Sequence, residues 1–295
     1  MLKEYLSKRY PKDSPQQVAV RSYVLEAWDR FRSAGLGDKN MEAEMCSGNE
    51  ARYHQRMSEL LLADQMLQAG LKPSSTTAGP DFLLETNERR TWIEVVCPEP
   101  NGIPSEYLQR KDGECLQVPH EAILLRWTAA LQEKWKKLNK YIEKDLVLPE
   151  DSYVIAVNGR MLSDFGGMDF VGISQFPYAV EAAFAVGPLA MQIDRKTLEL
   201  IKTEHQHRPL IPKPKGKPVE ASMFLSEEYS RVSAIWATSI DETIALGNPY
   251  RSEVVHNPRA STPLQINLPA FYEHRAENAD DGFMVLSREP GLLKR

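Results

Sequence analysis

Hydrophobic positions in the first 70 residues recur at the spacing of amphipathic helices. The stretch Ser14–Phe31 places apolar residues on one stripe at intervals close to 3.6 residues. A stronger stripe runs from Ala51 to Ala69, and Gly70 follows as a stop signal. The apolar positions of this second stripe are Tyr53, Met57, Leu60, Leu61 and Leu67. The pattern therefore predicts two helices in this region.

The spacing changes after residue 80, where two short runs are rich in apolar residues of strand type. Asp81–Thr86 and Thr91–Cys97 are separated by the polar residues 87–90. A four-residue polar break between two such runs is typical of a β-hairpin. A loop of Pro, Ser, Thr and Gly precedes the pair over residues 72–80.

A long helix and a buried strand are predicted next. Residues Pro98–Pro119 form a proline-containing loop, which we expect to be mobile in the free protein because loops of this length are commonly functional. Glu121–Lys144 carries an apolar stripe with a cation-rich opposite face. Tyr153–Gly159 is almost wholly apolar and predicts a central strand.

The last third of the chain contains three further candidate strands, Leu198–Thr203, Val232–Thr238 and Glu253–His256. A basic, proline-rich stretch over residues 205–218 cannot form a helix or a central strand. No segment has the composition of an interdomain linker. We therefore predict one α/β domain with a mixed sheet, in which 1–50 is a helical extension, 51–160 the core, and 161–295 strands and loops that complete or extend the sheet.

Composition limits the classes of function. The chain has 295 residues, of which 42% are hydrophobic and 26% charged, so it can bury a core and is not a disordered protein. Its net charge is −5, so contact with nucleic acid would depend on local basic patches. No P-loop or GxGxxG motif is present, which gives nucleotide-driven chemistry no support.

The cysteines and the start of the chain suggest a compartment. Cys46, Cys97 and Cys115 are widely spaced with no CxxC pair, which argues against a disulfide framework or a zinc knuckle and fits a reducing environment. The first residues are charged and lack an apolar segment, so they do not read as a signal peptide. We expect a cytoplasmic protein without membrane contact. His205 and His207 alternate as in a metal-binding strand, but their proline-rich surroundings favour a loop without a metal role.

Two acids of the predicted hairpin are the strongest candidates for chemistry. Asp81 opens the first strand and Glu94 lies late in the second, so both can project toward one point at the same end of the sheet. Two carboxylates and the carbonyl oxygen of Val95 would offer Mg²⁺ or Mn²⁺ the hard oxygen ligands that these ions prefer. The alternative is that Asp81 caps a turn and Glu94 is a solvated strand residue.

These residues resemble the motif of the PD-(D/E)xK nuclease superfamily. Pro80-Asp81 matches its PD element, and Glu94-Val95-Val96 matches (D/E)xK at the acid but not at the lysine. The resemblance covers roughly residues 51–159. It implies a restriction-endonuclease-like mixed central sheet flanked by helices. It also implies Mg²⁺- or Mn²⁺-dependent cleavage of nucleic acid, with DNA expected as the substrate ahead of RNA. It also implies a third acid on the upstream helix, where Glu59 either assists the metal site or is a surface residue.

The missing lysine leaves two interpretations open. Val96 can neither position an attacking water nor offset charge on a phosphate. In the first interpretation a cation of the long helix replaces the lysine, with Lys134 as the first candidate and Arg126 and Lys137 after it. In the second the chain is a degenerate nuclease fold that binds nucleic acid or a protein without cutting. A hydrolase acting on a small phosphoester also remains possible. The other lysines of this helix are expected to be solvated: Lys136, Lys140 and Lys144.

Overall fold

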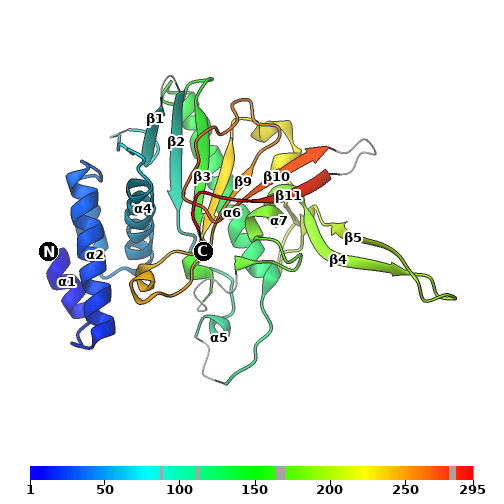
Figure 1. Ribbon diagram of the computed structural model, residues 1–295, viewed down its shortest axis with the longest axis horizontal. Helices are drawn as coiled ribbons and strands as arrows, with labels where there is room; N and C mark the ends of the chain where they lie inside the picture. The colour runs from blue at the N-terminus through cyan, green and yellow to red at the C-terminus, as the bar shows by residue number, and fades with distance from the viewer. Residues whose placement is uncertain (77, 87–88, 110–112, 164–169, 279–283, 295) are drawn as a thin grey trace.

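The protein is an α/β structure built on a seven-stranded mixed sheet (Figure 1). The computed structural model describes residues 1–294 except 77, 87–88, 110–112, 164–169 and 279–283. The strands lie in the order β1-β2-β3-β8-β9-β10-β11. Their bounds are β1 Phe82–Thr86, β2 Arg89–Val96, β3 Ser152–Asn158, β8 Ala234–Thr238, β9 Ser252–His256, β10 Tyr272–Asn278 and β11 Met284–Pro290.

The directions of the strands determine which side chains meet at one edge. Strands β2, β3 and β8 are parallel, and β1 is antiparallel to β2. The carboxyl ends of β2, β3 and β8 therefore lie at the same edge as the start of β1. On the far side, β9 is antiparallel to β8, β10 is parallel to β9, and β11 is antiparallel to β10.

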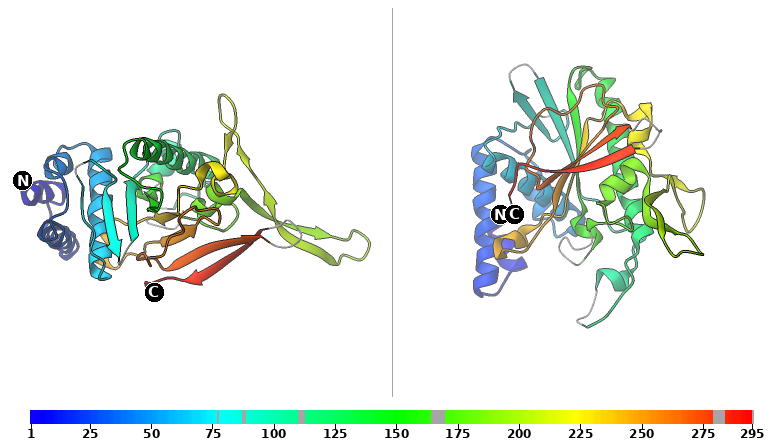
Figure 2. Two further views of the ribbon diagram at one scale, coloured as in Figure 1. Left: turned by 90° about the horizontal axis from the view of Figure 1, so that it is seen from above. Right: turned by 45° about the vertical axis from the view of Figure 1, so that its right-hand side comes forward.

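Helices cover both faces of the sheet, so the core has two layers. On one face, α4 packs against β2 and is itself covered by α2, whereas α6 and α7 lie on the other face (Figures 1 and 2). Strand β2 alternates between the two layers. Ile93 and Val95 belong to the layer of α4, and Trp92 and Val96 to the layer of α6. The helices are α1 Leu2–Arg9, α2 Pro15–Ser33, α3 Met41–Met45, α4 Glu50–Gln68, α5 Ser105–Leu108, α6 His120–Ile142 and α7 Tyr178–Phe184.

The main helices and central strands agree with the predictions from the sequence. Helix α2 begins at Ser14, whose Oγ accepts a hydrogen bond from the Gln17 amide at 3.4 Å. Helices α4 and α6 and strands β3, β8 and β9 each lie within two residues of the predicted bounds. The hairpin is also present, although residues 87–88 of its polar break lie outside the described residues.

The segment around the predicted strand Leu198–Thr203 differs from expectation. Strand β5 (Leu200–His207) starts later and runs through both histidines, which the pattern had placed in a loop. It pairs with β4 (Val186–Ile193) in a separate two-stranded sheet that projects from the body (Figures 1 and 2). After His207 the proline-rich stretch contains only the two-residue strand β6 (Leu210–Ile211), which pairs with β7 (Val219–Glu220) directly after the stretch.

Several smaller elements connect these layers. The long loop after β2 contains the short helix α5, whose Tyr107 is buried against the core, so part of this loop is anchored. The described residues also form 3₁₀ turns, η1 Gly159–Leu162, η3 Met223–Leu225, η4 Glu227–Tyr229 and η5 Glu242–Leu246. None of the helices in the described part of the chain combines the length and apolarity that a bilayer span requires.

Candidate functional site

Glu94 is the centre of the candidate site. Its side chain is fully buried, with 0% exposed, yet it carries a carboxylate on the face of β2 that packs against α6. Lys134 Nζ lies 2.9 Å from Glu94 Oε1, and Lys137 Nζ lies 2.6 Å from the same oxygen. Tyr141 donates its hydroxyl to Oε2 at 3.2 Å. These donors follow one another at i, i+3 and i+7 along α6, which places them on one side of the helix.

Asp81 lies beside Glu94 at the same edge of the sheet. It directly precedes β1, and because Phe82 faces Ile93 in the ladder, Asp81 takes the position that faces Glu94. Its Oδ2 accepts a hydrogen bond from the Val95 amide at 2.7 Å. Burial, together with the nearby negative charges of Glu94 and Glu59, raises the pKa of Asp81 to about 8. The hairpin therefore brings these acids into one electrostatic environment.

Glu59 joins the group from the opposite layer. It is buried on α4 and is therefore not a surface residue, whereas a role in a metal site stays a prediction. Arg56 donates to its Oε2 at 2.7 Å, and Gln55 donates to its Oε1 at 2.9 Å. Burial raises its pKa, although Arg56 opposes that change. The electrostatic influence of Glu94 on Glu59 shows that the helix places its acid near the strand pair.

Gln55 connects α4 to the end of β2. Its Nε2 donates to the carbonyl of Val95 at 3.2 Å, and its Oε1 accepts from the Cys97 amide at 2.9 Å. The same amide group also bonds Glu59, so one side chain fixes both an acid and the carbonyl expected as a ligand. Gln55 therefore holds the helix and the strand at a set separation.

The cations of α6 divide into two groups. Lys134 contacts Glu94 as the sequence suggested, and Lys137, which the sequence placed below it, also does so. Arg126 takes a different position, because its Nε donates to the carbonyl of Glu99 at 2.7 Å and so ties the helix to the loop after β2. Val96 is buried against α6 in the apolar core. The remaining lysines are exposed as expected: Lys136, Lys140 and Lys144.

Tyr141, Gln55 and Arg56 are polar members of the site that the sequence analysis did not identify. One signal was available, because Lys134-x-x-Lys137-x-x-x-Tyr141 is a polar line on a helix whose neighbouring positions are apolar. Gln55 and Arg56 gave no comparable signal, since polar residues beside an apolar stripe are usually solvated.

The donor set suits a hard divalent cation in type. The side chains of Asp81 and Glu94 and the carbonyl of Val95 are oxygen donors, and burial, followed by the negative charges of Glu94 and Glu59, raises the pKa of Asp81. Among the residues that the structure describes, no three His, Cys, Asp or Glu are close enough together to hold a metal ion. The chain would therefore supply at most two carboxylates, with water completing the shell.

A hollow opens along the same edge, at the carboxyl ends of β3 and β8. Trp127, Gly159, Arg160 and Ser239 are among its lining residues. Arg160 forms an ion pair with Asp241, which follows β8. Ligands of open α/β sheets commonly bind at the carboxyl ends of parallel strands.

The histidines at 205 and 207 lie away from this edge, on the projecting strand β5. The ring of His205 bonds the carbonyl of Gly187 at 3.0 Å.

Comparison with protein-family models, with curated proteins and with solved structures gives no match to this chain.

Proposed function

We propose that the protein is a metal-dependent nuclease of the PD-(D/E)xK type, with Asp81 and Glu94 at its catalytic centre and DNA as its first candidate substrate. The observation that carries the proposal is the 2.9 Å contact between Lys134 Nζ and Glu94 Oε1. This contact places a cation beside Glu94. The cation is needed from α6 because Val96 occupies the strand position that holds the lysine in the motif. The alternating layers of β2 support this, because Val96 and Glu94 face the same helix.

Each residue of the site then has a distinct task. Asp81, Glu94 and the Val95 carbonyl would hold Mg²⁺ or Mn²⁺, which when bound would supply the positive charge that polarises a phosphodiester. Lys134 would orient the attacking water and offset charge on the phosphate. Gln55 and Glu59 would fix the orientation of the strand end. Tyr141 restrains Glu94 through its second oxygen.

Exposed basic residues offer contacts for the phosphate backbone despite the net charge of −5. They lie on the outer face of α6, at Lys136, Lys140 and Lys144, and in the turn between β6 and β7, at Lys213, Lys215 and Lys217.

The test is cleavage of labelled duplex DNA, single-stranded DNA and RNA with Mg²⁺, with Mn²⁺ and with a chelator. We expect metal-dependent cleavage that Asp81→Asn reduces by about 10³-fold, the size of a lost electrostatic contribution to the transition state. Glu85→Gln is the matched control, because Glu85 is an exposed acid on the same strand. If the wild-type protein cuts none of the substrates, or if both variants cut equally well, the nuclease proposal is wrong.

One observation favours a second candidate, a degenerate nuclease fold that binds nucleic acid or a protein. Both oxygens of Glu94 already accept hydrogen bonds from α6, which leaves this carboxylate less available to a metal. In that case, gel-shift experiments would show binding of nucleic acid with no cleavage and no dependence on metal.

A further inference from the structure

Tyr153 buries a hydroxyl group for which the structure shows no partner. Its side chain is 0% exposed on the central strand β3, in the layer that packs against α6. Among the residues that the structure describes, no donor or acceptor lies within hydrogen-bond distance of the hydroxyl oxygen. The backbone of Tyr153 is bonded, because its amide donates to Ser233 Oγ at 2.9 Å and its carbonyl accepts from the Ser233 amide at 2.7 Å. The strand therefore fixes the tyrosine and leaves its hydroxyl unpaired.

A buried hydroxyl without a partner opposes folding, because it gives up its hydrogen bonds to water and gains none in return. Buried tyrosine and tryptophan side chains usually find a partner for their polar atom. Trp92 on β2 faces Tyr153 in the ladder, and its Nε1 donates to Asp151 at 2.9 Å. Phenylalanine at position 153 would fill the same space without the unpaired group. A hydroxyl kept at this position indicates a partner in another state of the molecule.

The hydroxyl of Tyr153 lies in the negative surroundings of the Glu94 site. In the parallel ladder Ile155 faces Glu94, so Tyr153 is two residues from that position on the same face of the sheet. Burial, and after it the nearby groups Glu94, Tyr141 and Asp81, raise the pKa of Tyr153 well above its usual value. The hydroxyl therefore stays protonated at neutral pH and can donate to a carboxylate.

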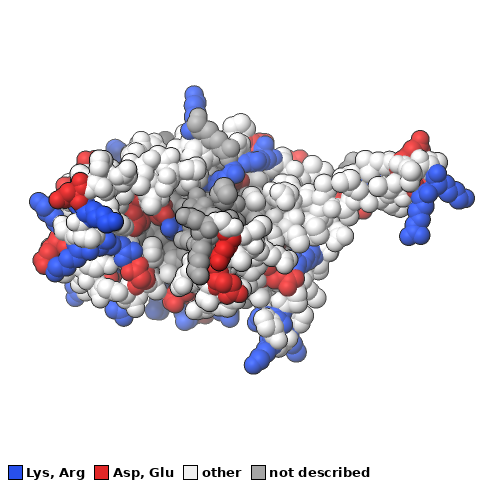
Figure 3. All heavy atoms as spheres, turned by 90° about the horizontal axis from the view of Figure 1, so that it is seen from below, with Lys and Arg blue, Asp and Glu red and all other residues white. Residues whose placement is uncertain are grey.

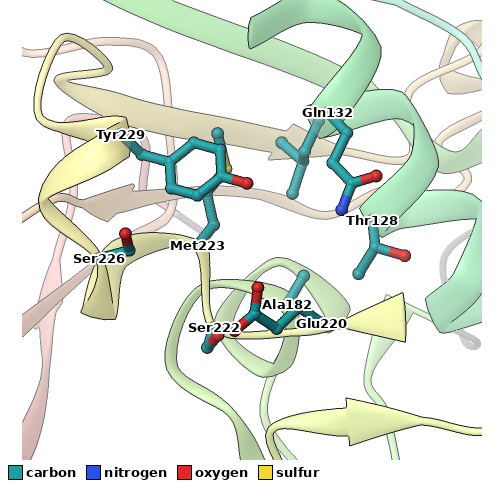
Figure 4. A pocket seen from close by; sticks show the side chains of 9 residues that line it. Thr128, Gln132, Ala182, Glu220, Ser222, Met223, Ser226 and Tyr229 are labelled. Atoms are coloured by element: carbon teal, nitrogen blue, oxygen red, sulfur yellow. The ribbon is translucent and has the colours of Figure 1, made fainter. Parts of the chain in front are cut away.

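The two hollows beside α6 do not include Tyr153. One is lined by Gln132 and Tyr229 among others, and Figure 4 shows that these side chains come from α6 and from the segment before β8. The other lies at Trp127 and Arg160, beyond the carboxyl end of β3, whereas Tyr153 is at the start of that strand. This leaves the carboxylates of the Glu94 site as the candidate partners of the hydroxyl.

Glu94 is held by α6 in this structure. Lys134 and Lys137 donate to its Oε1, and Tyr141 donates to its Oε2. A carboxylate with both oxygens engaged in this way has to give up a bond when it takes an ion. Carboxylates that ligate metals are themselves hydrogen-bonded by neighbouring groups. Tyr153 is a donor on the same face of the sheet that has no competing bond among the described residues.

We propose that Tyr153 is a positioning residue, which donates its hydroxyl to the Glu94 carboxylate when that carboxylate turns from Tyr141 to bind a divalent cation. The inference rests on the proposed function, because it takes Glu94 as a metal ligand. The two tyrosines then have opposite tasks. Tyr141 stabilises the ion-free arrangement of Glu94, and Tyr153 stabilises the ion-bound arrangement. Their balance sets the affinity of the site for the ion.

Binding of the ion can be measured apart from catalysis, by isothermal titration calorimetry of the full chain with Mn²⁺ or Mg²⁺. Surface acids add little to such a titration where they have basic neighbours. Figure 3 shows Asp and Glu side chains beside Lys and Arg side chains on the face that it draws. Arg9, for example, pairs with Glu50 at 2.7 Å. Asp81→Asn gives the reference for binding that does not involve the site.

Tyr153→Phe should weaken the binding of Mn²⁺ by about 10- to 100-fold, the usual effect of losing a group that orients a metal ligand. Its guanidinium unfolding midpoint without metal should equal or exceed that of the wild type, because the variant removes an unpaired hydroxyl. Cleavage by this variant should reach the wild-type rate at a correspondingly higher concentration of Mn²⁺. Tyr23→Phe is the matched control and should bind the ion as the wild type does, because Tyr23 also buries its hydroxyl but lies on α2.

Tyr141→Phe should have the reverse effect and tighten the binding of Mn²⁺ by about 2- to 10-fold, because it removes a hydrogen bond that competes with the ion. Equal affinity in Tyr153→Phe and the wild type, or weaker binding in Tyr141→Phe, would overturn this inference and leave the proposed function standing. A wild type that binds no more ion than Asp81→Asn would overturn both. A wild type that binds Mn²⁺ but cuts no substrate would refute the nuclease proposal alone, and the affinities of the two variants would still decide the role of Tyr153.

Discussion

Two buried glutamates on the same sheet have opposite surroundings. Among the described residues, the side chains that bond or pair with the Glu253 carboxylate on β9 are a histidine and two arginines: His274 Nε2 lies 2.6 Å from its Oε2, and Arg288 and Arg251 lie 3.5 and 3.9 Å from its Oε1. Glu94 on β2 also has two cationic partners, but the acids Asp81 and Glu59 lie near it.

We expect the Glu253 cluster to stabilise the folded state, and we expect the burial of several acids around Glu94 to oppose folding. At Glu253 several donors surround a single carboxylate, which is how folded proteins usually accommodate a buried charge. At Glu94 several acids are buried in one region, and the pKa of Asp81 is raised by its burial first and by the charges of Glu94 and Glu59 after it. Local arrangements that oppose stability tend to occur at functional sites. The two clusters therefore differ in composition: one buried acid has histidine and arginine partners, and the other has further acids beside it.

The largest expected effect is on turnover at the Glu94 cluster. Lys134→Ala should reduce nuclease turnover by about 10²- to 10⁴-fold, the usual size of a general acid–base or electrostatic contribution. It should also lower stability, because the lysine is buried and bonded to Glu94. Lys140→Ala, on the exposed face of α6, should cut at the wild-type rate. Adding Val96→Lys to Lys134→Ala should recover part of the rate. Equal turnover in Lys134→Ala and the wild type would mean that Lys134 does not replace the motif lysine, and Lys137 would be tested next.

The Glu253 cluster should respond in the opposite way. Glu253→Gln should lower the free energy of unfolding by about 2 kcal/mol, because it weakens the hydrogen bond to the buried His274, whereas Arg251 and Arg288 are partly exposed and lose little. Nuclease turnover should not change at a temperature where the variant is folded. Guanidinium unfolding and the cleavage assay measure the two quantities separately. A variant that keeps its stability but loses turnover would reverse the assignment of the two clusters.

Metal should distinguish the clusters through thermal stability. At a concentration of Mg²⁺ about 100 times its Kd, a single site stabilises the folded state by about 2.7 kcal/mol. For a chain of 295 residues that corresponds to a rise in Tm of about 4 °C. Asp81→Asn should abolish the rise, and Glu253→Gln should retain it. A rise of equal size in Asp81→Asn would place the ion elsewhere.

A third buried glutamate gives the smallest expected effect. Glu181 on α7 accepts a hydrogen bond from the Ser174 amide at 2.7 Å, and burial raises its pKa. Because its pKa in the folded state exceeds that in the unfolded state, it favours folding at low pH, and this contribution is lost as pH rises through the folded-state value. The stability of Glu181→Gln relative to wild type should therefore increase between about pH 4 and pH 8. Denaturant unfolding at the two pH values measures it, and a constant difference would contradict the argument.

Sequence pattern was sufficient for elements whose burial is periodic. The hairpin, α4, α6 and β3 follow from alternation or helical stripes, because each buries one defined face. The position of Asp81 beside Glu94 followed from the hairpin alone, since register in a short hairpin is local.

Contacts between distant elements could not be predicted in the same way. Gln55 reaches Val95 only because α4 crosses the end of β2, and no pattern in either segment encodes that crossing. Arg126 is a cation on the same helix as Lys134, but a loop carbonyl takes its Nε. Strand β4 and its pairing with β5 were missed for a different reason, because the apolar residues of this ribbon are not buried in this chain and its turn contains charged residues.

The position of the cations on α6 has a consequence for recognising related proteins. A lysine two residues after the acid is the usual element of a motif search, but here that strand position contributes to the apolar core. The contact is made instead by a residue 40 positions further along the chain. A search pattern built from this geometry would require an acid on a buried strand and, one helix later, Lys-x-x-Lys-x-x-x-Tyr along a polar line. Such a pattern would find chains that short linear motifs pass over, and it would leave the position two residues after the acid free to vary with the packing.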